Sequence, residues 1–404
     1  MKFSSLLPRC LICFTMIGLA TTTLAEARSN GSLPGGGRDV GKTVIYRDSW
    51  GIPHIYAPTD KGGLYAQGYA MAQDRPDQLL LNLLTAVGEL SSVVGDGAVQ
   101  SDLRSHLFDH YGAARKNWHQ IPRVIQRHTE AFVAGINVFY KEHPEDIPTW
   151  WQGRQVDKYM VIAFGRLFLY NWSIDEAYGD LRRSGVRPGY QPAQRGSNQF
   201  AVSPRRSASR AAILAIDPHL AWFGPSRFWE FRIHAGALHG SGVTLAGFPY
   251  IGLGHNANLA WAMTTGGPDT ADVYALTVKE GDNRQFLFDG KWLTLRSRTV
   301  TLKVKGAASQ RHTLWFAPHG PIIAWQEGKA YAAAMAYGDT VNISGAWFAL
   351  NYGHDYRAAV EGMESLTVFP QNVMVADTGG NIYYQRTGRV PVRPNGFDWS
   401  RAVD

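Results

Sequence analysis

Hydrophobic positions recur with a helical period in the first part of the chain and with a strand period in the second. The segment DQLLLNLLTAVGEL places its leucines on one helical face, and further helices are predicted from about 124 to 140 and from 159 to 170. From Ser197 onward the apolar residues occur in short runs, such as QFAVSP, AAILAID and GVTLAG, separated by Gly, Pro and Asn. This change of period predicts an α+β protein.

A polar segment separates the two parts. The sequence RRSGVRPGYQPAQRG is rich in Arg, Gly and Pro and poor in apolar residues, as expected of an exposed linker. We therefore expect a mainly helical region over residues 26–185, a linker or spacer over 186–196, and a strand-rich region over 197–404.

The N-terminal residues, 1–25, have the features of a secretory signal peptide. A basic start precedes an apolar run from 11 to 20, and small residues at Thr23 and Ala25 suit a signal peptidase. An uncleaved membrane anchor is the alternative, but the apolar run is short for a bilayer. We expect a periplasmic or secreted protein without a stable membrane anchor.

Composition narrows the chemistry further. Both cysteines, Cys10 and Cys13, lie in the signal peptide, so the mature chain would hold no thiol, disulfide or cysteine metal site. The net charge of +7 permits contact with nucleic acid or anionic lipid. Because basic and acidic residues are interspersed along the chain, we interpret the charge as a solubility feature and expect no nucleic-acid partner.

The segment GGGRDVGKT, with Gly36, Gly41, Lys42 and Thr43, satisfies the P-loop formula. A true P-loop follows a strand and opens a helix, so that its backbone amides cradle phosphates. Here a glycine-rich leader precedes the segment, and the strand-like sequence TVIYRDSWGIPHIYA follows it. We therefore exclude nucleotide binding.

The stretch QRGSNQFAVSP indicates a different chemistry. If the Gly196–Ser197 bond is cleaved, Ser197 becomes an N-terminal residue that carries its own base, because a free α-amine has a pKa of about 7.7 to 8.0. The alternative is a serine in a turn before a strand.

The residues after Ser197 predict a hairpin that brings a histidine to it. Strands over 198–203 and 211–216, joined by a turn, place Ser197 opposite Pro218 and beside His219. A histidine at this place can orient the amine or polarise the carbonyl, although a lone histidine is more often an ordinary surface or core residue.

Attack on an amide carbonyl also requires hydrogen-bond donors for the developing oxyanion. The segment GHNANLAWAMTTGGPD leaves the backbone amide of Thr265 or Gly266 free at the end of a predicted strand. The segment FPQNVMVADTGG offers the side-chain amide of Asn372.

In their order along the chain, these motifs resemble the penicillin acylase family of N-terminal nucleophile hydrolases, which includes penicillin, cephalosporin, acyl-homoserine lactone and aculeacin-type lipopeptide acylases. The matching segments are YRDSWGIPHIYA, QGYAMAQDR, GSNQFAVSP, DPHLAW, GHNANLAWAMTTGGPDTADVY and QNVMVADTGGNIYYQRTGRVPVR. The resemblance implies a four-layer αββα sandwich. It also implies a precursor that cuts itself before Ser197 by an N-to-O acyl shift, releases a spacer and remains together as an α/β heterodimer.

The resemblance implies cleavage of an N-acyl amide, such as a β-lactam, an acyl-homoserine lactone or a lipopeptide, with no cofactor for the chemistry. Ser197 matches the nucleophile. His219 matches a histidine of most homoserine lactone and cephalosporin acylases, where penicillin G acylases carry glutamine, and it favours a non-penicillin acyl group. Thr265, or Gly266 one residue on, matches the backbone oxyanion donor, and Asn372 matches the side-chain donor.

Three carboxylates align with calcium ligands of some relatives: Glu176, Asp269 and Asp272. Carboxylates suit a hard cation, so the resemblance implies a structural Ca²⁺ ion. The alternative is that these acidic residues cap or solvate a turn.

Leu220 and Met263 are expected to line an apolar acyl cavity, with Trp222, Phe223 or Tyr250 nearby, unless they are ordinary core residues. The strand-rich region stops well short of the usual β chain of the family, so we expect a sandwich that is incomplete at its C-terminus. We predict an exported, self-processing amidohydrolase. The alternatives are a truncated, inactive homologue acting only as an exported binding protein and a basic surface-binding protein.

Overall fold

The computed structural model describes residues 42–190, 196–222 and 224–404. The predicted signal peptide, both cysteines and part of the predicted linker lie outside these residues. The α-helices are α1 (Asp60–Asp74), α2 (Pro76–Val87), α3 (Ser91–Val94), α4 (Val99–Leu107), α5 (His110–Asn117), α6 (Arg123–Glu142), α7 (Lys158–Arg183), α8 (Ser344–Tyr352) and α9 (Tyr356–Glu364).

The first strands along the chain are β1 (Val44–Arg47), β2 (Pro53–Ala57), β3 (Gly196–Val202), β4 (Ile213–His219), β5 (Phe228–Ala235), β6 (Leu238–Leu245), β7 (Leu253–Asn256), β8 (Leu259–Thr265) and β9 (Ala271–Lys279). The others are β10 (Asp282–Phe288), β11 (Lys291–Thr294), β12 (Arg296–Leu302), β13 (Gln310–Ala317), β14 (Gly320–Gln326), β15 (Lys329–Met335), β16 (Gln371–Asp377) and β17 (Ile382–Arg386). The α+β prediction is confirmed.

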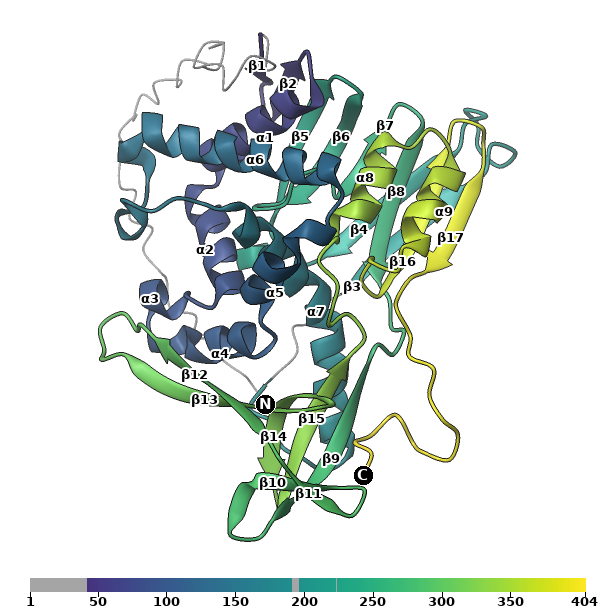
Figure 1. Cartoon of the computed structure of the whole chain (residues 1–404). Coiled ribbons are helices and arrows are strands. Elements are labelled where there is room, and N and C mark those ends of the chain that lie inside the picture. The colour runs from purple at the N-terminus through teal and green to yellow at the C-terminus, as the bar shows by residue number, and fades with distance from the viewer. Residues whose placement is uncertain (1–41, 191–195, 223) are drawn as a thin grey trace, which may run out of the picture.

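An eight-stranded main sheet organises the molecule, in the order β1-β2-β5-β6-β7-β8-β16-β17. Helices α1 and α6 cover one end of it, and α8 and α9 lie in front of the other end (Figure 1). The hairpin β3–β4 packs against β8 and β16. Helices, main sheet and hairpin thus form successive α, β and β layers.

The two predicted regions are interleaved in the fold. Strands β1 and β2 come from the helical part of the sequence, yet they form the edge of the main sheet next to β5. The predicted helix over 159–170 is too short, because α7 continues to Arg183. Most of α7 is buried, so it shows no clear alternation of apolar and polar faces at which a boundary could be read.

The segment that satisfies the P-loop formula leads into a strand. Lys42 and Thr43 are followed directly by β1, and no helix opens there. A phosphate-binding loop requires the N-terminus of a helix at this point. The exclusion of nucleotide binding therefore agrees with the described part of the segment.

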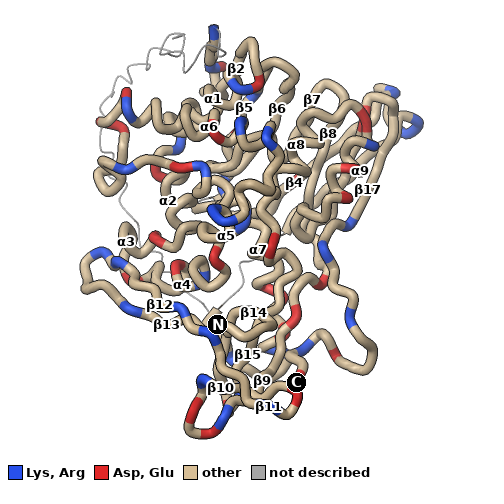
Figure 2. Tube along the Cα trace, viewed as in Figure 1, with Lys and Arg blue, Asp and Glu red and all other residues tan. Residues whose placement is uncertain are grey.

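A second sheet of seven strands, in the order β11-β10-β9-β15-β14-β13-β12, extends below the main sheet (Figure 1). Lysine and arginine are scattered among aspartate and glutamate along the described chain (Figure 2). None of the described helices is long and apolar enough to cross a membrane.

Helices α1 and α6 cross at two glycines. A Cβ on Gly135 would overlap the carbonyl oxygen of Tyr65, and a Cβ on Gly68 would overlap that of Phe132. The absence of side chains lets the two backbones touch, which brings the buried faces of both helices together over the main sheet.

We expect Gly135→Ala to lower the free energy of unfolding by about 3 kcal/mol, because the helices must separate to admit one methyl group. Gly97→Ala is the control, since a Cβ there meets no atom within 4 Å. Chemical denaturation of both variants measures the difference. Equal stabilities would contradict the close packing of α1 on α6.

Candidate active site

An apolar cavity opens between the helices, the main sheet and the β3–β4 hairpin. The space among its walls, including the open mouth, is about 750 Å³. Its residues are Phe164, Gly165, Phe168, Trp172, Ser197, Pro218, Leu220, Phe228, Thr244, Leu245, Phe248, Gly252, Leu253, Met263, Thr265, Ile343, Trp347, Phe369 and Gln371. A hydrophobic group of a ligand would be well accommodated by such walls.

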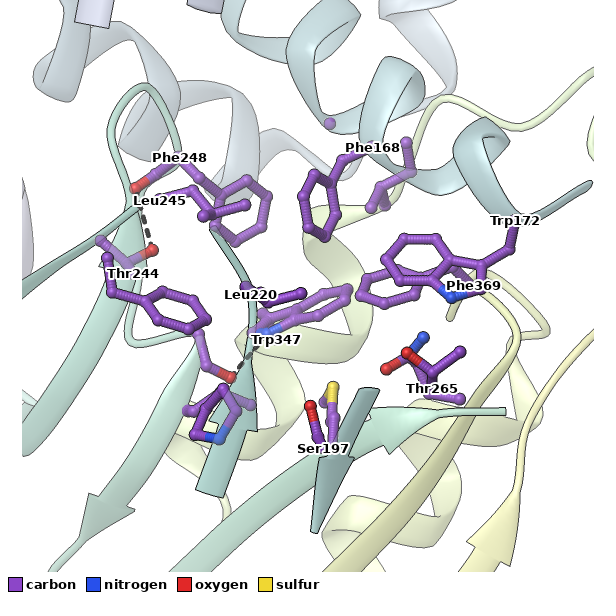
Figure 3. A pocket seen from close by; sticks show the side chains of 18 of the residues that line it. Phe168, Trp172, Ser197, Leu220, Thr244, Leu245, Phe248, Thr265, Trp347 and Phe369 are labelled. Atoms are coloured by element: carbon purple, nitrogen blue, oxygen red, sulfur yellow. Dashed lines mark hydrogen bonds between the residues drawn. The ribbon is translucent and has the colours of Figure 1, made fainter. Parts of the chain in front are cut away.

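Stacked aromatic rings form the wall opposite the hairpin (Figure 3). Phe369 lies between Trp172 and Trp347, with ring centroids 4.7 and 5.4 Å from its own and nearly parallel planes. The indole nitrogen of Trp347 donates to the carbonyl of Gly252 at 3.0 Å. The wall is therefore rigid, because its rings are held by each other and by the backbone.

Helix α7 supplies the other aromatic side chains of this wall. Phe164, Phe168 and Trp172 lie four residues apart, so they follow one face of the helix. This spacing was visible in the sequence. Nothing in the pattern distinguished a cavity wall from an ordinary core, which is why these residues were missed.

Ser197 lies at one end of the cavity, on β3, with Thr265 beside it (Figure 3). The predicted hairpin register is confirmed, since Ser197 pairs with Pro218 and Gly196 with His219. Ser197 and Pro218 both line the cavity. The Ser197 hydroxyl donates to the Gly196 carbonyl, so it lies against the bond that the sequence predicts to be cleaved.

His219 faces the other side of the hairpin. Side chains alternate along a strand, so the His219 side chain lies with that of Asn198 and away from Ser197. Its Nε2 is 2.9 Å from Asp217 Oδ2, and half of the side chain is exposed. The imidazole contacts the Gly196 side of the Gly196–Ser197 bond, where a Cβ on Gly196 would lie 3.7 Å from its Nδ1.

The two candidate backbone donors differ in their hydrogen bonding. The Gly266 amide donates to the Pro370 carbonyl, so it is already used. Thr265, the last residue of β8, pairs with Gln371, so the alternation of antiparallel bonding turns its N–H away from β16. Of the two amides, that of Thr265 is therefore the one not bonded to the strand segment that leads into β16.

Asn372 lies beside Thr264 on the neighbouring strand. Its side-chain nitrogen donates to the Thr264 hydroxyl at 3.1 Å and to the Thr265 carbonyl at 3.0 Å. The backbone carbonyl of Asn372 accepts a hydrogen bond from the side-chain nitrogen of Gln199, at 3.0 Å, which ties β3 to β16. Asn372 therefore adjoins the end of β8, although it is not one of the residues that line the cavity.

The structure places the expected acyl-binding residues as follows. Leu220 and Met263 both line the cavity. Trp222 is 90% exposed, and Tyr250 is buried elsewhere, with its hydroxyl 2.8 Å from His128 Nδ1. Phe223 lies outside the described residues.

The three expected calcium ligands lie at the foot of α7. Glu176 accepts from the backbone amide of Thr270 at 2.8 Å, and burial raises the pKa of its carboxyl to about 7. Burial, aided by Asp269, also raises the pKa of Asp180 to about 7. Asp180 also pairs with Arg183 at 2.6 Å. A cation beside Glu176 would lower the raised pKa of that carboxyl, because positive charge favours its ionised form.

An arginine meets two of the same carboxylates. Arg393 lies 2.8 Å from Asp272 and 3.0 Å from Asp269, and its side chain is only 15% exposed. Among the described residues, the group whose three ligand atoms lie within 4.8 Å of one another is His143, Glu145 and Asp146, not these three carboxylates. As arranged here, the three do not form one coordination sphere, and calcium stays a prediction.

Comparisons with known proteins identify the family of the chain. The sequence profile described as Penicillin amidase matches residues 42–403. An acyl-homoserine lactone acylase, PvdQ, of Pseudomonas fluorescens is 26% identical over 392 residues, which covers 86% of this chain and 50% of that protein. The acyl-homoserine lactone acylase QuiP of Pseudomonas aeruginosa is 27% identical over 446 residues, covering 89% and 52%.

Among solved structures, the thermostable penicillin G acylase of Alcaligenes faecalis matches with a TM-score of 0.46 and 24% identity, over 50% of this chain and 37% of that one. The chain spans about half the length of the two acyl-homoserine lactone acylases.

We expect Glu176→Gln to change the pH dependence of stability. The folded-state pKa is about 7 and the unfolded one about 4.5, so the folded protein keeps a proton that the unfolded chain loses between these values. The free energy of unfolding therefore falls as pH rises from 4.5 to 7 in the wild type. In the variant, the free energy of unfolding should fall less over this pH range than in the wild type, by about 2 kcal/mol. The difference is no larger because the carboxyl is partly solvated.

Urea unfolding at several pH values measures this slope. Glu361→Gln, at an exposed position on α9, is the control. The same slope for both variants would show that Glu176 ionises normally in the folded protein.

Arg393→Ala tests whether an arginine occupies the place of a cation. The variant leaves the buried Asp272 carboxylate unpaired, so we expect a loss of about 3 kcal/mol of stability. Millimolar Ca²⁺ should then raise the melting temperature of the variant more than that of the wild type, because the ion and Arg393 compete for the same oxygens. An equal rise in both would mean that calcium binds with Arg393 in place.

Proposed function

Because the chain belongs to the penicillin amidase family, we propose that it is an exported, self-processing amidohydrolase whose nucleophile is Ser197. One observation carries the proposal. The Ser197 hydroxyl donates to the Gly196 carbonyl at one end of an apolar cavity, directly after the linker that separates the helical and strand-rich parts of the sequence.

That geometry supports self-processing. The Ser197 hydroxyl adds to the Gly196 carbonyl carbon, and the Gly196–Ser197 amide becomes an ester as its nitrogen takes up a proton. Water then hydrolyses the ester. The products are a new carboxylate at Gly196 and a free α-amine on Ser197, so the two chains form an α/β heterodimer held by the packing of α7 and the main sheet.

Hydrolysis of a substrate repeats this chemistry with the new amine as base. The α-amine accepts the hydroxyl proton, and Ser197 Oγ attacks the substrate carbonyl. The Thr265 amide and the Asn372 side chain donate to the oxyanion. The amine product leaves with a proton, and water then releases the acyl group from Ser197 as a carboxylic acid.

The walls of the cavity favour a hydrophobic acyl group. Leu220, Met263 and the stacked rings around Phe369 surround the space into which that group would extend from Ser197. The relatives named as acyl-homoserine lactone acylases support an aliphatic chain, and β-lactams and lipopeptides are the other candidate substrates.

The N-terminal signal sequence supports export to the periplasm or beyond. The alternative function is that of an exported binding protein without catalysis. It shares the cavity and predicts that the Gly196–Ser197 bond stays intact and that ligands are retained unchanged.

Intact mass and N-terminal sequencing of the wild type, Ser197→Ala and Ser203→Ala test the proposal. The wild type and Ser203→Ala should each yield a new chain that begins at Ser197, whereas Ser197→Ala should remain one chain. Turnover of a panel of penicillin G, long-chain acyl-homoserine lactones and lipopeptides should fall at least a thousandfold in Ser197→Ala. An uncut wild type that binds these ligands without turnover would support the binding-protein alternative.

A further inference from the structure

The Asn372 side chain is held from both ends. Its nitrogen donates to Thr264 and Thr265 at the end of β8. Its oxygen accepts a hydrogen bond from the hydroxyl of Tyr384, at 2.8 Å. Tyr384 is the diagonal neighbour of Asn372, since Asn372 pairs with Arg386, two residues further along β17.

These partners fix which way the amide points. A carbonyl oxygen can only accept, so the Thr265 carbonyl requires the nitrogen of Asn372 on its side. The Tyr384 hydroxyl then donates to the oxygen on the opposite side. Without this bond, the Asn372 oxygen loses its protein donor, and the amide is held at its nitrogen alone.

A ligand oxygen would have to replace the Thr264 hydroxyl as the acceptor of one Asn372 hydrogen. The Thr265 carbonyl holds one of the two hydrogens on the Asn372 nitrogen, and the other meets the Thr264 hydroxyl. A hydroxyl can rotate and find another partner, whereas a carbonyl cannot. Donation from Tyr384 to the amide oxygen also polarises the amide and makes the remaining N–H a stronger donor.

We propose that Tyr384 is a positioning residue for amide hydrolysis, which orients and polarises Asn372 as an oxyanion donor. The inference rests on the function proposed above for Ser197. Tyr384 is 55% exposed and does not line the cavity, so it acts through Asn372 and not by binding the acyl group.

Tyr384→Phe removes the hydroxyl and keeps the ring. We expect kcat to fall about tenfold, which is less than the loss from deleting an oxyanion donor, while KM changes by less than about twofold. The control is Tyr383→Phe, the adjacent residue, whose hydroxyl bonds to Gln385 at 3.0 Å and whose kcat should equal that of the wild type.

Asn372→Ala separates positioning from a general structural effect. In this background Tyr384→Phe should cause no further fall in kcat, because the amide that it orients is gone. A wild-type kcat in Tyr384→Phe, or the same tenfold fall in the Asn372→Ala background, would overturn the proposal.

Failure of the proposed function has a different signature. It would appear as no turnover by the wild type, or as turnover that persists in Ser197→Ala. The role of Tyr384 is then decided by nuclear magnetic resonance of the Asn372 side-chain NH₂ group in Ser197→Ala. Adding Tyr384→Phe should speed hydrogen exchange of this group, and unchanged signals would overturn the positioning role.

Discussion

The register of the β3–β4 hairpin on the main sheet is the constraint on which the whole site depends. Side chains alternate along β3, so Ser197 and Gln199 face the main sheet while Asn198 faces outward. A slip of one residue would turn the hydroxyl into solvent and bring Asn198 to the cavity. The hydrogen bond from the Gln199 side chain to the backbone carbonyl of Asn372 holds this register against β16.

Helix α7 connects the apolar cavity to a candidate oxyanion donor. Phe168 and Trp172 form part of the cavity wall, and Glu176, one turn further on, accepts from the Thr270 amide. Thr270 ends the short loop that starts after Thr265. The helix that lines the apolar cavity therefore also holds the loop that follows the candidate donor Thr265. On the proposed function, a change in its packing would affect both acyl binding and catalysis.

The sequence predicted those parts of the site that depend on local structure. The pairing of Ser197 with Pro218 follows from one short turn, and it is confirmed. Thr265 and Asn372 were candidate donors from their own segments, but only the family resemblance assigned both to one site, because no local pattern indicates that residues 107 apart are neighbours. The bonds of Arg393 to Asp269 and Asp272 were missed for the same reason, since they join segments more than 120 residues apart.

The aromatic wall of the cavity shows a second limit of prediction from sequence. Trp347 and Phe369 come from α8 and from the segment before β16, and Trp172 comes from α7. Each has the burial of a core residue. Whether such rings close on each other or leave a space depends on how three distant segments pack, and the spacing of apolar residues carries no information about it.

On the proposed function, the cavity and the hairpin would select different parts of a substrate. Each methylene that enters the apolar cavity contributes about 0.8 kcal/mol, or about fourfold in binding, until the chain reaches the wall opposite Ser197. Discrimination among acyl chains is therefore gradual, and chain length is limited by the far wall. The amine part of the substrate would lie outside the apolar cavity, on the solvent side of Ser197. Solvent-exposed polar contacts contribute little binding energy each, so most of the specificity should come from the acyl group.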